Sequence, residues 1–126
     1  LKSFPNKEII CVFGAGGNRD SAKRPLMGKV ALKYSKHIIV TSDNPRFEEP
    51  KAIIEDILAG IDDKSNVLVE ENRVEALKKA IEIADDKSVV LVLGKGDEAT
   101  QIIKDRKYPF SDKDEVLKIL CYNWLN

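Results

Sequence analysis

Several features are scarce in this sequence, and each scarcity excludes a class of protein. The 126 residues carry 21 basic and 21 acidic side chains, so there is no basic surplus for general binding to nucleic acid or anionic membranes. No apolar run approaches the ~20 residues that cross a bilayer, and no signal peptide opens the chain. We therefore expect a cytoplasmic protein that binds neither nucleic acid nor membrane.

Cysteine, histidine and tryptophan are also scarce. Cys11 and Cys121 are far apart, and Cys11 lies in an apolar run, so we expect it to be a buried, reduced thiol. The only histidine, His37, is expected to be structural, and the only tryptophan, Trp124, to pack at a helix end. We predict no metal site in this chain.

Apolar runs and helical patterns alternate along the chain. Continuous apolar runs, typical of strands buried on both faces, occupy residues 9–13, 37–40, 66–69 and 88–93, with a short extra candidate at 102–103. Helical patterns begin near four residues, namely Pro25, Pro50, Asn72 and Asp112. This alternation favours right-handed crossovers and a mostly parallel sheet with helices on both faces. We predict one Rossmann-like α/β domain over residues 1–126.

The first two helical patterns also predict an apolar face for each helix. In the first helix that face consists of Leu26, Met27, Val30, Ala31 and Tyr34. In the second helix it consists of Ile53, Ile54, Ile57 and Leu58. Gly60 is expected to end the second helix.

Three polar loops directly follow three of the predicted strands. They are the first loop (residues 14–20), the second loop (41–46) and the third loop (94–98). In a parallel sheet the carboxyl ends of the strands share one edge, and ligands bind there. We therefore expect these loops to lie together at a ligand-binding edge.

The first loop resembles part of a dinucleotide-binding motif. Gly14 and Gly16 fit G-x-G, but Arg19 occupies the position of the third glycine, and Asp43 comes too late to be the ribose-binding acid. These departures disfavour a nicotinamide or flavin site. The chain also has no G-x-x-x-x-G-K-[ST], so it has no ATP-cradling loop of its own.

The charges of the three loops complement one another. Arg19 and Arg46 suit a carboxylate, because a guanidinium fork binds two oxygens at once. Glu98 suits an ammonium group, and Asp43 and Asn44 can add hydrogen bonds. This combination is the one expected for a zwitterionic amino acid. The alternative is that these charges are solvated and pair among themselves.

The amino-acid sequences of the three loops resemble those of the C-terminal domain of the Mur ligase family, in particular of its UDP-N-acetylmuramoyl-tripeptide synthetases. The similar stretches are FGAGGNRD at 13–20, KRPLMG at 23–28, TSDNPR at 41–46 with EP at 49–50, and GKGDE at 94–98 followed by QI. Order and spacing agree across residues 9–120. The resemblance implies a three-domain, ATP-dependent enzyme of peptidoglycan synthesis, of which this chain is the third domain.

The implied reaction forms an amide bond. The γ-carboxylate of D-glutamate in UDP-N-acetylmuramoyl-L-Ala-D-Glu is activated as an acyl phosphate, and the amine of a diamino acid attacks it. By the resemblance, ATP and Mg²⁺ are held mainly by a central domain and the UDP-sugar by a first domain. None of the motifs of those domains is found here. We therefore expect no catalytic residue in this chain.

The resemblance assigns the binding of the added amino acid to seven residues, which are Arg19, Asp43, Asn44, Pro45, Arg46, Gly94 and Glu98. The Asp-Asn-Pro-Arg form is associated in the family with meso-diaminopimelate, whose distal carboxylate the arginine holds. Asn18 replaces the commoner aspartate, which is a mild change. Asp97 stands where the family usually has histidine, and its charge could favour the distal ammonium or admit another diamino acid such as lanthionine.

Two basic residues are candidates for a different role. Lys23 and Arg24 could face nucleotide phosphates when the domains of the enzyme close on one another. The chain begins at Leu1 rather than Met, and we expect it to be a piece of a longer protein.

Two other functions remain open at this point. One is a stand-alone Rossmann-like module that binds a small ligand and has no catalytic activity. The other is a sister ligase that adds a dipeptide or a different amino acid, although the motif at 43–46 argues against it.

Overall fold

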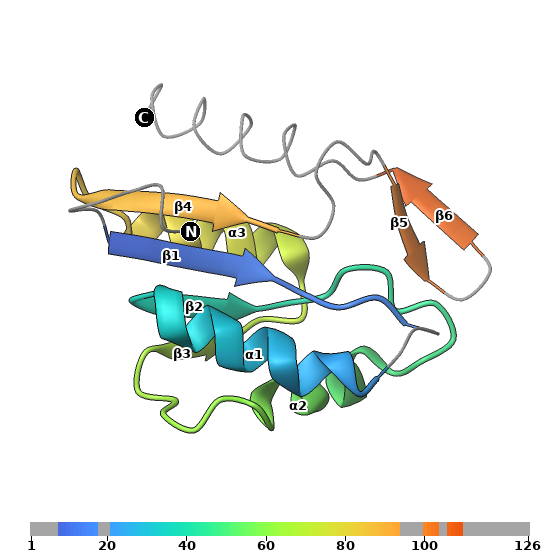
Figure 1. Ribbon diagram of the computed structural model, residues 1–126. Helices are drawn as coiled ribbons and strands as arrows, with labels where there is room; N and C mark the ends of the chain where they lie inside the picture. Colours follow the sequence, from blue (N-terminus) through green and yellow to red (C-terminus); the bar gives the residue numbers. More distant parts are fainter. Residues whose placement is uncertain (1–7, 18–20, 94–99, 104–105, 110–126) are drawn as a thin grey trace.

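The computed structural model describes residues 8–17, 21–93, 100–103 and 106–109 (Figure 1). Its strands are β1 (Glu8–Phe13), β2 (His37–Val40), β3 (Val67–Val69), β4 (Ser88–Val92), β5 (Thr100–Ile103) and β6 (Arg106–Pro109). Its helices are α1 (Lys23–Tyr34), α2 (Pro50–Leu58) and α3 (Arg73–Ile83). The helix predicted near Asp112 lies outside the described residues.

A four-stranded sheet in the order β3-β2-β1-β4 forms the centre of the fold. All its pairings are parallel, which confirms the prediction. Phe13 pairs with Val40 and Val12 pairs with Val92, so β1, β2 and β4 end almost level. The candidate strand at 102–103 is part of β5, which pairs with β6 in a separate antiparallel sheet. The sequence did not predict β6.

Both faces of the parallel sheet are covered, because successive strand side chains point to opposite faces. Cys11 and Phe13 of β1 belong to a buried cluster with residues of α1 and α2. Ile10 and Val12 belong to a second cluster with residues of α3. Figure 1 shows α1 and α2 on one side of the sheet and α3 on the other. The predicted α/β architecture is therefore confirmed.

The ends of the helices follow local signals in the sequence. Pro50 is at the first position of α2, where its missing N–H is not needed. The Asn72 side chain caps α3 by accepting a hydrogen bond of 3.1 Å from the backbone N–H of Glu75. α2 ends two residues before Gly60, and a Cβ at Gly60 would collide with the carbonyl oxygen of Pro25. That glycine is thus required by the close approach of α1.

The predicted apolar residues of α1 share one face, since Leu26, Met27, Val30 and Ala31 line the same groove, but most of that face is not buried. Leu26 is 60% exposed and Val30 is 51% exposed, whereas the buried residues of α1 are Arg24, Gly28 and Ala31. The reason is a close crossing with α2, since a Cβ at Gly28 would collide with a backbone carbonyl of that helix. This crossing fixes the rotation of α1 and turns its longer apolar side chains away from α2.

Candidate functional site

The carboxyl ends of β1, β2 and β4 bring two of the predicted loops into contact. The backbone N–H of Thr41 donates to the carbonyl of Phe13 over 2.9 Å, which continues the pairing of β1 and β2. The N–H of Gly17 donates to the carbonyl of Asn44 over 2.6 Å. The described part of the first loop therefore lies against the second loop, as the parallel sheet predicts. The third loop, with Gly94 and Glu98, lies outside the described residues.

Two of the three glycines of the first loop, Gly14 and Gly17, are explained by this contact. A Cβ at Gly14 would collide with the carbonyl oxygen of Thr41, and a Cβ at Gly17 would collide with that of Pro45. Only glycine allows two backbones to approach so closely. The packing of the two loops thus accounts for Gly14 and Gly17.

The second loop places its polar residues at this edge. Asp43 is half-buried, Asn44 is 6% exposed and Pro45 is buried. Because the loop backbone is tied to Gly17, these residues have a fixed place beside the first loop. Arg19 lies outside the described residues, so its predicted position near Arg46 and Glu98 stays a prediction.

Arg46 has an unusual backbone conformation. Its φ of 54° is in the left-handed region, which a non-glycine residue occupies at a cost of about 1–3 kcal/mol, and residues strained in this way cluster at functional sites. Its Nη1 donates to the carbonyls of Gly17 over 3.0 Å and Asn44 over 3.3 Å. In the described part of the chain both hydrogen bonds use Nη1, which leaves Nε and Nη2 of this half-exposed side chain for a ligand.

The two candidates for nucleotide contact have different surroundings. Lys23 is exposed at the start of α1. Arg24 is only 2% exposed and forms ion pairs with Glu48 over 2.7 Å and Asp56 over 2.9 Å. It also donates to the carbonyl of Gly16 over 3.0 Å, and its hydrogen bond with Glu48 raises its pKa further. These contacts give Arg24 a structural role, joining the first loop to α2, and do not support a nucleotide contact.

A second buried arginine was not found from the sequence. Arg73, the first residue of α3, is 2% exposed. Its Nη1 donates to the carbonyl of Ser42 over 2.8 Å, and its Nη2 donates to the carbonyl of Leu93 over 3.1 Å. The one signal in the sequence was an arginine directly after a helix N-cap, where a positive charge is unfavourable.

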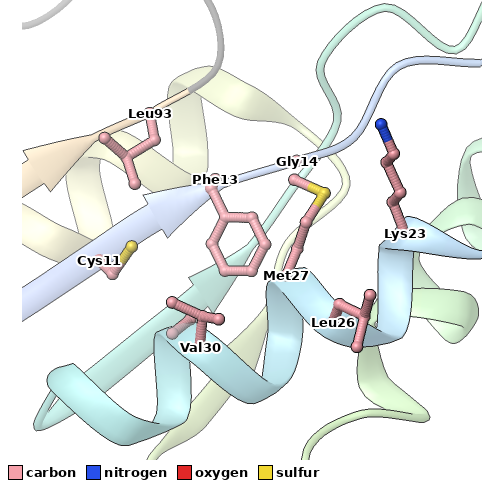
Figure 2. Close-up of a pocket in the computed structure, with 9 residues that line it drawn as sticks. Cys11, Phe13, Gly14, Lys23, Leu26, Met27, Val30 and Leu93 are labelled. Carbon is pink, nitrogen blue, oxygen red and sulfur yellow. The ribbon is translucent and has the colours of Figure 1, made fainter.

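A groove of about 490 Å³ lies beside the loops but differs from them in chemistry. Its walls come from β1, α1 and the end of β4, and among the described residues that line it Lys23 alone is charged. Figure 2 shows Phe13, Met27 and Val30 around its centre, with the Lys23 amino group at one end. A zwitterion in this apolar groove would lose hydration without gaining hydrogen bonds. The loops, and not this groove, therefore suit an amino acid.

Other predictions concern metals, thiols and membranes. Among the described residues, no group of three or more His, Cys, Asp or Glu side chains could hold a metal ion.

Cys11 is a buried, free cysteine, as predicted, and its burial raises the pKa of the thiol to about 11. In the same part of the chain, no helix has the length and apolar character needed to span a bilayer. The predicted cytoplasmic location stays a prediction.

The fold and the loops define a class of protein, a parallel α/β domain that gathers polar side chains for a small ligand at the carboxyl edge of its sheet. A comparison with protein families makes this specific. Residues 1–96 match the family described as Mur ligase, glutamate ligase domain. The chain belongs to this family, and the resemblance seen in the loops is confirmed.

Individual relatives agree with this result. The chain is 60% identical over 113 residues to the UDP-N-acetylmuramoyl-L-alanyl-D-glutamate--2,6-diaminopimelate ligase of Aquifex aeolicus (strain VF5), covering 90% of the chain and 23% of the relative. It is 50% identical over 120 residues to the ligase of the same name from Wolinella succinogenes, covering 95% of the chain and 28% of that relative. The chain thus spans about a quarter of the length of these relatives.

A solved structure is similar as well. A structure of a UDP-N-acetylmuramoyl-L-alanyl-D-glutamate--2,6-diaminopimelate ligase matches with a TM-score of 0.88 and 39% identity, covering 93% of this chain and 24% of that chain. These relatives are named as ligases, so the alternative of a stand-alone binding module is not favoured.

Proposed function

We propose that this chain is the C-terminal, amino-acid-binding domain of an ATP-dependent ligase. The ligase adds meso-diaminopimelate, or a related diamino acid, to the D-glutamate of UDP-N-acetylmuramoyl-L-Ala-D-Glu in peptidoglycan synthesis. The relatives named as 2,6-diaminopimelate ligases support this proposal, because the similarity to them extends over at least 90% of the chain.

The observation that carries the proposal is the placement of Arg46. Its Nη1 is anchored on two backbone carbonyls, while Nε and Nη2 carry no hydrogen bond within the described residues. An edge of a guanidinium that is fixed on one side and open on the other is suited to a bidentate contact with a carboxylate. A carboxylate distal to the reacting amine distinguishes diaminopimelate from lysine.

The proposed role of the domain is to hold the diamino acid in position. Arg46 binds the distal carboxylate, and Asp43 and Asn44 contribute hydrogen bonds from the same loop. Holding the nucleophilic amine in a fixed place lowers the entropic part of the reaction barrier. The described residues of this chain contribute position rather than chemistry.

ATP and Mg²⁺ do not fit the described residues of this chain. The sequence has no phosphate-cradling loop, the described part offers no metal-binding group, and Arg24 is turned toward Glu48 and Asp56. We therefore assign these groups to the rest of the ligase and derive no step through them. Lys23, exposed at the start of α1, remains a candidate for nucleotide contact when the domains close.

The test is a comparison of two substrates in the complete protein encoded by the gene. The variants are Arg46→Ala, Arg46→Lys and, as a matched control, Lys51→Ala, which removes an exposed cation from α2. Loss of the bidentate contact is expected to lower kcat/KM for meso-diaminopimelate roughly 30- to 1000-fold, with little effect on any residual turnover of lysine. The measurement is ADP release at several concentrations of each amino acid.

The outcomes separate two failures. An equal loss for both amino acids in Arg46→Ala would give Arg46 a structural role and remove the basis of the specificity. No turnover of any diamino acid by the unaltered protein would overturn the proposed function itself. Arg46→Lys is expected to resemble Arg46→Ala more than the unaltered protein, because an ammonium group is a point charge without a planar fork.

A further inference from the structure

Arg73 lies beneath the edge of the sheet that carries the binding loops. It is the first residue of α3, the helix that covers the face opposite α1 and α2, and it follows the N-cap Asn72. Its side chain is almost fully buried. It is therefore placed to act on the loops from inside the protein, without reaching a ligand in the cleft.

Two described acceptors of Arg73 lie near the start of the second loop and directly before the third loop. The Ser42 carbonyl, 2.8 Å from Nη1, directly precedes Asp43, and the Leu93 carbonyl, 3.1 Å from Nη2, directly precedes Gly94. Ser42 follows β2 and Leu93 follows β4, and these strands are not neighbours because β1 lies between them. The guanidinium thus joins two loop origins that the sheet itself does not hydrogen-bond to each other.

The stability of α3 does not explain this arginine. A positive charge at a helix N-terminus is repelled by the positive end of the helix dipole. A buried charge also loses hydration, which only good hydrogen bonds can offset. Arginine has a further property that suits this place, because its planar fork donates to separate acceptors from separate nitrogens in a fixed geometry, whereas lysine donates from a single compact ammonium.

We propose that Arg73 is a positioning residue of the amino-acid site, which sets the spacing between the second loop, with Asp43 to Arg46, and the end of β4 at Leu93. This inference rests on the proposed function for its effect on the reaction. The structural part of the inference, that Arg73 holds Ser42 and Leu93 together, does not depend on the proposed function. Loss of Arg73 is expected to let Ser42 and Leu93 move independently, and so to loosen the second loop.

The experiment uses the complete protein and three variants. Arg73→Met keeps the length and apolar volume of the side chain, and Arg73→Lys keeps the charge. Leu77→Ala is the matched control, because Leu77 is buried on the same helix, packs against the sheet and makes no described contact with the loops. The thermal midpoint of each variant is measured first, so that losses of stability can be compared.

Two readouts follow for each variant. In the kinetic readout, Arg73→Met is expected to raise KM for meso-diaminopimelate at least 10-fold and to leave KM for ATP within twofold. Arg73→Lys is expected to recover part of this loss. In the exchange readout, amide hydrogen exchange is expected to accelerate in peptides covering both 41–46 and the end of β4 at Leu93 in Arg73→Met, but in neither peptide in Leu77→Ala.

The outcomes distinguish this inference from the proposed function. If Arg73→Met changed KM and loop exchange no more than Leu77→Ala does, Arg73 would be a core residue and the inference would be overturned. The same holds if all the substrates lost affinity equally. If the unaltered protein failed to turn over diaminopimelate, the proposed function would fail, and the exchange readout would still decide whether Arg73 holds Ser42 and Leu93 together.

Discussion

At the scale of single residues, the two buried arginines show what a sequence pattern does not reveal. Arg24 was a candidate for nucleotide contact because it could face nucleotide phosphates when the domains of the enzyme close. The structure surrounds it with Glu48, Asp56 and the Gly16 carbonyl. Burial and partners of a charge depend on tertiary packing, so its role could not be predicted from spacing. Arg46 was found because its motif is specific and its side chain is next to the predicted edge.

A prediction at this scale concerns the thiol of Cys11. Its pKa is raised from 9.0 to about 11 by burial, so the folded protein holds the proton more tightly than the unfolded chain. The associated stability is complete below pH 9 and is lost as the pH rises toward 11, in total about 3 kcal/mol. Urea unfolding between pH 8 and 11 is expected to show a steeper decline for the unaltered chain than for Cys11→Ala. Parallel declines would show that Cys11 titrates normally.

At the scale of elements, the sheet and α2 could be predicted closely, and the rotation of α1 could not. β2 and the first residue of α2 occur where the sequence indicates, because apolar runs and an N-terminal proline are local signals. The face of α1 depends on its crossing with α2 at Gly28, which is a tertiary contact. Periodicity detected a row of apolar side chains in α1 but not that Leu26 and Val30 line an open groove.

Gly28→Ala tests this crossing. Helix propensity alone would make alanine stabilising by about 1 kcal/mol. At Gly28, however, the new Cβ would collide with the carbonyl oxygen of Ile57 and come within 3.0 Å of Ile61 Cγ1. Overpacking of this kind costs about 1–3 kcal/mol, so the net effect is expected to be destabilising. Lys29→Ala, at an exposed neighbouring position, is the control, and a higher thermal midpoint for Gly28→Ala would contradict the close crossing.

At the scale of the whole molecule, the proposed function makes the chain one wall of an amino-acid site. It spans about a quarter of the length of its relatives, and its described residues gather polar side chains without any metal-binding group. The sheet order and the two joined loops show how such a wall is built from local elements. The remaining residues of the site, Arg19, Gly94 and Glu98, were predicted from the resemblance and remain to be tested.

The last prediction is that these 126 residues fold alone but catalyse nothing. Two buried clusters, one on each face of the sheet, supply a core of domain size. A small zwitterion on one open wall stays largely hydrated, and its ion pairs are screened, so binding of meso-diaminopimelate is expected to be weak. In the complete ligase proposed above, binding is expected to tighten when the domain closes on the nucleotide-loaded remainder and excludes water. Calorimetric titration and an ADP-release assay check both parts. Turnover by these residues alone would contradict the proposal that this domain only binds the amino acid while the rest of the ligase carries out the reaction. Micromolar binding would show that the pocket is preformed.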